Sequence, residues 1–168
     1  MNRLALDQLG PRPGDRVLEV GFGGGALLRA MAVAGAEAVG VEISEAMVAR
    51  AGRLDVRLAS ADSLPFVDAA FDKAVSVNSL YFWPDPKKAL AELARVVKRG
   101  GRLTLCFEPA EELRKWPGHR FGFQLFEIAE VKALMIAAGF GAIEESWGTG
   151  RKPDRFCCLS GTRIGANR

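Results

Sequence analysis

The chain has 168 residues, enough for one domain whose core needs neither disulfides nor a metal to hold it together. Hydrophobic residues make up 49% and charged residues 26%, which excludes a disordered or fibrous protein. The net charge of +3 is modest and no basic stripe interleaved with aromatics accompanies it, so we expect no nucleic-acid partner. No uncharged apolar run reaches membrane-spanning length and the N-terminus does not resemble a signal peptide, so we expect no membrane association.

Apolar runs typical of strands alternate with helical patterns along the chain. Seven strands are predicted, at residues 16–20, 37–43, 55–60, 73–78, 102–108, 142–147 and 155–160. The first five are separated by segments long enough for crossover helices, which predicts a mostly parallel sheet with helices on both faces. The last two are separated only by GTGRKPD and should form an antiparallel hairpin. The expected fold is therefore a single α/β domain over residues 1–168, with a Rossmann-like, doubly wound, seven-stranded sheet.

The helices between these strands have their own start and stop signals. Ser44 is expected to cap the helix that begins with EAMVARAG. Asp85 is a plausible N-cap for the next long helix, with Pro86 at its first position and Gly100 or Gly101 ending it. A later helix is predicted over residues 128–138, terminated by Gly139.

Cysteine and histidine are too few and too scattered for a metal site of the usual kind. The cysteines are Cys106 and the adjacent pair Cys157 and Cys158, without a CxxC spacing, and His119 is the sole histidine. We therefore expect buried, reduced thiols, no metal, and a protein of the reducing cytoplasm.

The stretch VLEVGFGGG at residues 17–25 ends a buried strand in glycines. Glycines allow a sharp turn and let a ligand approach the backbone, since no β-carbon intervenes. The helix that follows points its amino-terminal N–H groups at that ligand, which suits a phosphate or a carboxylate. Gly21, Gly23 and Ala26 also satisfy GxGxxA, so a dinucleotide site is formally allowed.

Two carboxylates discriminate between these ligands. Glu42 follows Gly21 by 21 positions, at the end of the second strand, where a carboxylate can accept hydrogen bonds from both hydroxyls of a ribose. Glu19 lies at the mouth of the glycine turn, where a pyrophosphate would meet like charge and an ammonium group would meet favourable charge. S-adenosyl-L-methionine carries an ammonium, a carboxylate and an adenosine, so it explains the pattern better than a nicotinamide dinucleotide does.

With these residues in view, the sequence resembles a class I S-adenosylmethionine-dependent methyltransferase, similar to the ubiquinone and menaquinone biosynthesis group. Four blocks carry the resemblance in the family's order: LEVGFGGG (18–25), VGVEIS (39–44), ASADSLPFVDAAFDKAVSVNSLYFWPDP (59–86) and LARVVKRGGRLTLCFEP (93–109). Together they span most of the chain.

The resemblance implies positions for the cofactor. The residues it places around the methionine portion are Glu19, Gly21, Phe22, Gly23 and Gly25; those at ribose and adenine are Glu42, Ile43, Ser60, Ala61 and Asp62; Asn78 lies beside the sulfonium. Ser60 stands where the family usually has an Asp, and Asp62 either substitutes for it or caps a turn. Alternatively, Asn78 caps the segment that follows it.

The resemblance also implies methyl transfer to a small-molecule acceptor whose O, N, C or S nucleophile the sequence does not determine. Displacement from a sulfonium releases a neutral leaving group, so alignment and desolvation matter more than an acid. The candidates for a base are Tyr81, where relatives often carry a histidine, and His119. Aromatic residues cluster around both and either line a pocket for an apolar or planar acceptor or pack beneath loops.

Relatives usually carry an N-terminal extension that closes over cofactor and acceptor, and we expect this chain to lack it. Two other functions therefore stay open. One is a cofactor-binding protein that does not catalyse on its own, or that acts with a partner chain; a homodimer is compatible with the sequence. The other is an NAD-dependent oxidoreductase, which Glu19 and the absence of a second catalytic domain disfavour.

Overall fold

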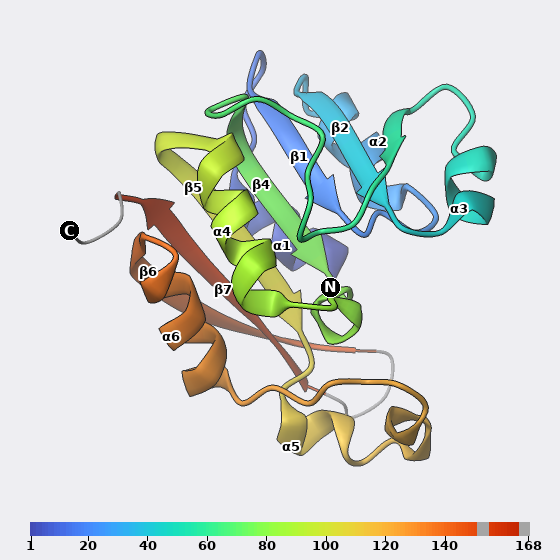
Figure 1. Ribbon diagram of the computed structural model, residues 1–168, viewed down its shortest axis with the longest axis vertical. Helices are drawn as coiled ribbons and strands as arrows, with labels where there is room; N and C mark the ends of the chain where they lie inside the picture. Colours follow the sequence, from blue (N-terminus) through green and yellow to red (C-terminus); the bar gives the residue numbers. More distant parts are fainter. Residues whose placement is uncertain (151–154, 165–168) are drawn as a thin grey trace.

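The structure, a computed structural model, describes residues 1–150 and 155–164. Within them, strands run in one sheet in the order β3-β2-β1-β4-β5-β7-β6 (Figure 1). The strands are β1 (Arg16–Val20), β2 (Glu37–Glu42), β3 (Asp55–Leu58), β4 (Phe71–Val77), β5 (Val97–Phe107), β6 (Phe140–Thr149) and β7 (Arg155–Arg163). The first five pair in parallel, and β7 pairs antiparallel with both β5 and β6. The predicted fold class is confirmed.

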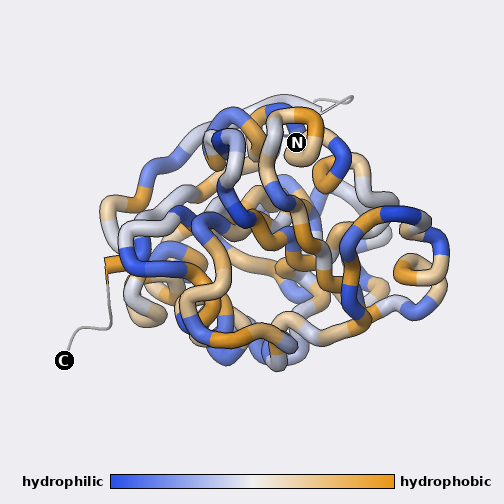
Figure 2. The backbone as a smooth tube through the Cα atoms, turned by 90° about the horizontal axis from the view of Figure 1, so that it is seen from above, coloured by the Kyte–Doolittle hydropathy of each residue, from blue (hydrophilic) through white to orange (hydrophobic). Residues whose placement is uncertain are grey.

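Helices cover both faces of this sheet. The helices are α1 (Asn2–Leu9), α2 (Ala26–Val33), α3 (Glu45–Arg50), α4 (Pro86–Val96), α5 (Ala110–Leu113) and α6 (Ile128–Ala137). Buried residues of α4 and α6 pack in one hydrophobic cluster, and those of α1 and α2 pack in another on the opposite face. Strand residues alternate between the two clusters, as Val17 and Leu18 of β1 do, because successive side chains of a strand point to opposite faces. Figure 2 shows how hydrophobic and hydrophilic residues are distributed along the backbone.

Caps at two helices agree with the sequence prediction. The Ser44 hydroxyl accepts the Met47 N–H at the start of α3, and the Asp85 carboxylate accepts the Lys88 N–H at the start of α4. In both helices this side chain satisfies one of the amino-terminal N–H groups that lack an intrahelical partner.

The predicted end of α4 is wrong. The helix stops at Val96, and β5 begins at the next residue, so Gly100 and Gly101 lie within the strand rather than after the helix. At Gly101 an added β-carbon would lie 2.5 Å from the Asp72 carbonyl oxygen. The glycine signal is therefore real, but it marks a close approach of two strands where their register shifts, not a helix terminator.

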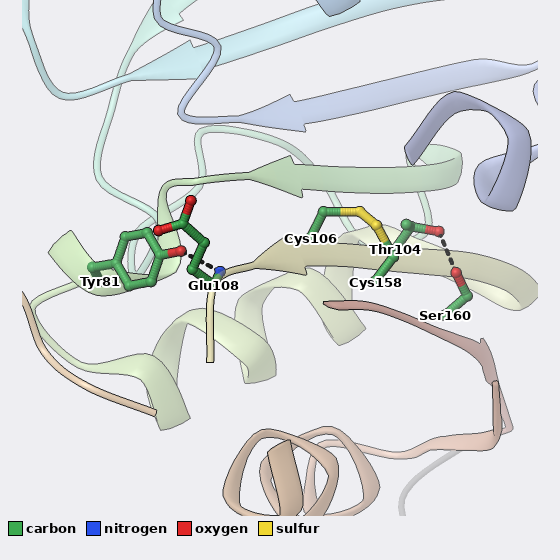
Figure 3. The surroundings of a disulfide bond; sticks show 6 residues. All are labelled: Tyr81, Thr104, Cys106, Glu108, Cys158 and Ser160. Carbon is green, nitrogen blue, oxygen red and sulfur yellow. Dashed lines mark hydrogen bonds between the residues drawn. A yellow bond between two sulfur atoms is a disulfide. The ribbon is translucent and has the colours of Figure 1, made fainter. Parts of the chain in front are cut away.

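The expectation of three reduced thiols is also wrong. Cys106 on β5 lies opposite Cys158 on β7, with a Cα–Cα distance of 4.1 Å, and the two form a disulfide (Figure 3). Cys157 points to the other face of the sheet and is buried as a free thiol. The pairing depends on β7 inserting between β5 and β6, which spacing along the chain does not reveal.

The segment between β5 and β6 contains short helices that the sequence did not predict. It holds α5 and a turn of 3-10 helix at Pro117–Arg120, and lies at one end of the molecule in Figure 1. The Gln124 N–H donates to the Tyr81 carbonyl, which joins this segment to the loop after β4. No helix within residues 1–150 and 155–164 is long and apolar enough to cross a bilayer.

Candidate functional site

A cavity of about 710 Å³ opens where β1, β2, β3 and β4 end, at the carboxyl edge of the parallel strands. Open α/β sheets bind their ligands at this edge. The lining residues are 1–2, 19–24, 26–27, 41–44, 47, 59–61, 77–79 and 82–84. Most of the residues predicted to bind a cofactor are among them: Glu19, Gly21, Phe22, Gly23, Glu42, Ile43, Ser60, Ala61 and Asn78. Gly25 and Asp62 are not.

Three glycines of the loop after β1 have positive φ angles, but for different reasons. At Gly21 (φ 76°) an added β-carbon would lie 2.1 Å from the Ser79 hydroxyl oxygen, and at Gly25 (φ 73°) it would lie 2.6 Å from the Leu54 side chain. At Gly23 (φ 50°) it would have nothing within 4 Å. Gly21 and Gly25 therefore let protein groups pack closely, whereas the open side of Gly23 lies at the cavity.

The Glu42 carboxylate ties the glycine loop to the end of β2. Its Oε2 accepts the Gly23 N–H at 3.1 Å, and its Oε1 accepts the N–H groups of Ile43 at 2.9 Å and Ser44 at 3.2 Å. Each oxygen has two lone pairs, so Oε2 keeps acceptor capacity on the cavity side. Glu42 thus shapes the loop and presents an acceptor to any ligand in the cavity.

Glu19 is a carboxyl group buried in the cavity wall. Its side chain is 3% exposed, and its Oε2 has no hydrogen-bond partner among the described residues. Burial raises its pKa to about 8, a backbone hydrogen bond from Leu28 opposes that shift, and the nearby Glu42 carboxylate adds to it. The group is therefore largely protonated at neutral pH and would gain strongly from a cation placed against it.

Ser60 supplies a second polar atom without a partner. Its Oγ is buried and makes no hydrogen bond among the described residues, while the residue lines the cavity at the end of β3. Asp62 lies in the following turn, which the Ser63 N–H closes on the Ser60 carbonyl. A hydroxyl left unpaired in a cavity wall is typical of a site that a ligand completes.

Asn78 and Tyr81 form one polar chain after β4. Asn78 has a left-handed backbone (φ 57°), and its N–H donates to the Cys106 carbonyl. The Tyr81 hydroxyl donates to Asn78 Oδ1 at 3.0 Å. It also accepts the Glu108 N–H, as Figure 3 shows. Burial raises the pKa of Tyr81, and this residue does not line the cavity, so its position does not suit the expected base.

The structure does not bring His119 to the cavity wall. It lies in the 3-10 turn Pro117–Arg120, where its Nδ1 is 2.6 Å from the Trp116 carbonyl oxygen. Sequence reasoning missed Ser79, which packs on Gly21, and Glu108, whose backbone orients Tyr81. Glu108 could have been found as an acid directly after the fifth predicted strand. Nothing in the sequence indicates the contact of Ser79 with Gly21.

Comparison with known proteins agrees with this arrangement. Residues 18–105 match the family described as "Methyltransferase domain" (Methyltransf_11). The uncharacterized methyltransferase YdaC of Bacillus subtilis is 32% identical over 169 residues, covering 95% of this chain and 90% of YdaC. The demethylmenaquinone methyltransferase of Corynebacterium kroppenstedtii is 38% identical over 101 residues, covering 59% of this chain and 44% of that protein. The match thus spans less than half the length of that relative.

Among solved structures, a SAM-dependent methyltransferase of Thermotoga maritima superposes with a TM-score of 0.78 at 25% identity, covering 96% of this chain and 90% of the other. The chain therefore belongs to the methyltransferase domain family of class I S-adenosylmethionine-dependent enzymes. It is a methyltransferase, and S-adenosyl-L-methionine is its cofactor.

Proposed function

We propose that the cavity binds S-adenosylmethionine along the carboxyl edge of the sheet and that its methyl group passes to a small-molecule acceptor. The observation that carries this proposal is a pair of buried polar atoms without partners, Glu19 Oε2 and Ser60 Oγ, in one cavity with the open α-carbon of Gly23. A ligand with an ammonium at one end and an adenine at the other would satisfy both. We also propose that residues 1–168 act as one methyltransferase domain, since the strands of the described residues form a single sheet.

The order of the strands orients the cofactor in this proposal. Glu42 at the end of β2 receives the ribose hydroxyls, and Ser60 at the neighbouring β3 receives the adenine edge. Glu19 at the end of β1 receives the ammonium, which places the sulfonium toward Asn78 at the end of β4. The other residues assigned to the cofactor surround it: Gly21, Phe22, Gly23 and Gly25 at the methionine portion, Ile43 and Ala61 at adenine, and Asp62 behind Ser60.

The bound cofactor supplies an electrophilic methyl group whose leaving group departs neutral. The chain's own residues then have to align the acceptor with the methyl group and exclude water. Both effects, orientation and desolvation, lower the barrier to methyl transfer. We assign neither Tyr81 nor His119 as the base, because neither lines the cavity. The acceptor's own acidity then decides whether a base is needed.

Turnover is tested by incubating the protein with S-adenosylmethionine and a panel of small phenols, amines, thiols and enolisable ketones, and measuring S-adenosylhomocysteine release. The proposal expects release above the acceptor-free rate with at least one class. Cofactor binding without release for any class would favour the second candidate, a cofactor-binding protein that needs a partner chain.

Replacing Ser60 with aspartate is expected to tighten cofactor binding severalfold. A carboxylate accepts a stronger hydrogen bond from the adenine amino group than a hydroxyl does, and the position is already unpaired. Calorimetric titration of Ser60→Asp and Ser60→Ala with S-adenosylhomocysteine checks this. Equal affinity of the wild-type protein, Ser60→Asp and Ser60→Ala for S-adenosylhomocysteine would remove Ser60 from the adenine site.

Gly23→Ala is expected to weaken cofactor binding about tenfold or more, because its methyl group would project into the cavity beside the ligand. Gly52→Ala is the matched control: Gly52 has a comparable φ of 66°, also has open space around its β-carbon position, and does not line the cavity. Both variants should lose similar thermal stability. A similar loss of affinity in both would assign the effect to backbone strain.

A further inference from the structure

The side-chain amide of Asn78 has a fixed orientation. The buried Tyr81 hydroxyl accepts the Glu108 N–H, so its own proton must go to another acceptor, and Asn78 Oδ1 receives it at 3.0 Å. The reversed amide would offer Nδ2 to Tyr81 and leave the phenolic proton without that acceptor. With Oδ1 engaged, Nδ2 is the side-chain donor that Asn78 can still offer to a ligand, and the residue lines the cavity. The site thus offers a hydrogen-bond donor where the methyl group is expected.

Beyond Asn78 the cavity wall is aromatic. Phe82, Trp83 and Pro84, in the segment that follows β4, line it. Phe82 is 53% exposed, and its ring packs edge-on against Phe123 at 4.6 Å between centroids. Trp83 is buried and donates its indole N–H to Ser79 Oγ. This wall is held in place and suits the face of a planar molecule.

Among the residues that the structure describes, the same wall carries no cationic side chain to pair with an anion. Among the lining residues there is no lysine or arginine side chain, and the acids are Glu19 and Glu42, both assigned to the cofactor. Met1 also lines the cavity, and burial lowers the pKa of its α-amino group, which disfavours the charged form of that group. A phosphate or carboxylate on the acceptor would therefore lose its hydration without gaining a partner.

We infer that Asn78, held by Tyr81, forms a subsite for an uncharged planar acceptor that carries an oxygen able to accept a hydrogen bond from Asn78 Nδ2. Tyr81 is a positioning residue in this subsite. The inference rests on the proposed cofactor site, because bound cofactor fills the cavity up to Asn78. It narrows the acceptor from any small nucleophile to a neutral ring compound with a carbonyl-type oxygen.

The test uses three bicyclic probes of similar size with the protein saturated by S-adenosylhomocysteine: chromone, which has a carbonyl acceptor, indole, which has an N–H donor, and the anion 2-naphthoate. Dissociation constants come from ligand-observed NMR. For the wild-type protein we expect chromone to bind at least about fivefold more tightly than indole, the worth of one hydrogen bond, and 2-naphthoate to bind most weakly.

Asn78→Asp keeps an oxygen for Tyr81 and turns the cavity-facing donor into an acceptor, so indole should then bind more tightly than chromone. Tyr81→Phe frees the amide to rotate, and the chromone-to-indole ratio should fall toward one. A merely structural role would weaken both probes alike. Thermal unfolding checks that each variant is folded, and S-adenosylhomocysteine is kept at a saturating concentration for each variant.

The inference is overturned if wild type prefers indole, if Asn78→Asp leaves the order unchanged, if 2-naphthoate binds as tightly as chromone, or if no probe binds to the saturated protein. Failure of S-adenosylhomocysteine to bind wild type would instead overturn the proposed cofactor site, so the two failures are distinguishable.

Discussion

Glu42→Ala should weaken binding of S-adenosylmethionine about a hundredfold or more. The carboxylate is placed to accept charge-assisted hydrogen bonds from the ribose hydroxyls, each worth about 1.5–3 kcal/mol. It also holds the Gly23 N–H at 3.1 Å, so its removal frees the glycine loop as well as the ligand. The dissociation constant is measured by calorimetric titration at constant pH.

Glu37→Ala is the control for this change, since Glu37 begins the same strand at the end away from the cavity. Its side chain is 65% exposed and pairs with Arg16 at 3.2 Å, a surface ion pair of little energetic weight. It should leave affinity unchanged. An affinity of Glu42→Ala within about threefold of wild type would remove Glu42 from the ribose site.

Glu19→Gln should lower cofactor affinity about tenfold and, at the same time, stabilise the free protein at alkaline pH. The neutral amide cannot form an ion pair with the cofactor's ammonium. Unlike the carboxyl group, it also carries no charge in its buried site when the pH rises. A lower cofactor affinity together with a higher free energy of unfolding is expected of a group that serves ligand binding at the expense of stability. Titration with S-adenosylhomocysteine and urea unfolding at pH 6 and pH 8 measure the two effects.

The sign of the pH dependence follows from the raised pKa of Glu19. Because its folded-state pKa of about 8 exceeds the ordinary value of 4.5, the folded protein holds a proton that the unfolded chain releases between those values. The free energy of unfolding should therefore fall by about 1.4 kcal/mol per pH unit as pH rises through this window, and this slope should disappear in Glu19→Gln.

Glu92→Gln provides the contrasting control. Hydrogen bonds from Arg95 lower the pKa of Glu92, so its stabilising effect is present above the ordinary pKa and lost only as pH falls. That variant should be destabilised equally at pH 6 and pH 8. A slope that persists in Glu19→Gln would show that Glu19 is already ionised in the free protein.

The strand pattern and the glycine loop could be read from the sequence because their causes are local. Branched apolar runs become buried parallel strands, and an acid, spaced glycines and a later acid must converge when β1 and β2 are neighbours. The order of the motifs, which resembles that of the methyltransferase family, then predicted S-adenosylmethionine as the cofactor. The same local logic correctly identified the caps at Ser44 and Asp85.

What the sequence did not reveal depends on contacts between distant segments. The disulfide requires β7 to lie beside β5 in the register that faces Cys106 with Cys158. Likewise, the sequence predicts Tyr81 as a candidate base, whereas in the structure its hydroxyl is buried and hydrogen-bonded to Asn78 and Glu108. Side-chain orientation of this kind is decided by tertiary packing, not by spacing along the chain.

The most direct test of the account is a calorimetric titration of the wild-type protein with S-adenosylmethionine, S-adenosylhomocysteine and NAD. The account predicts that the first two bind at one site per chain and that NAD does not, since NAD carries no ammonium group to pair with the buried Glu19 carboxyl, whose Oε2 has no partner among the described residues. Binding of NAD, or of none of the three, would contradict it.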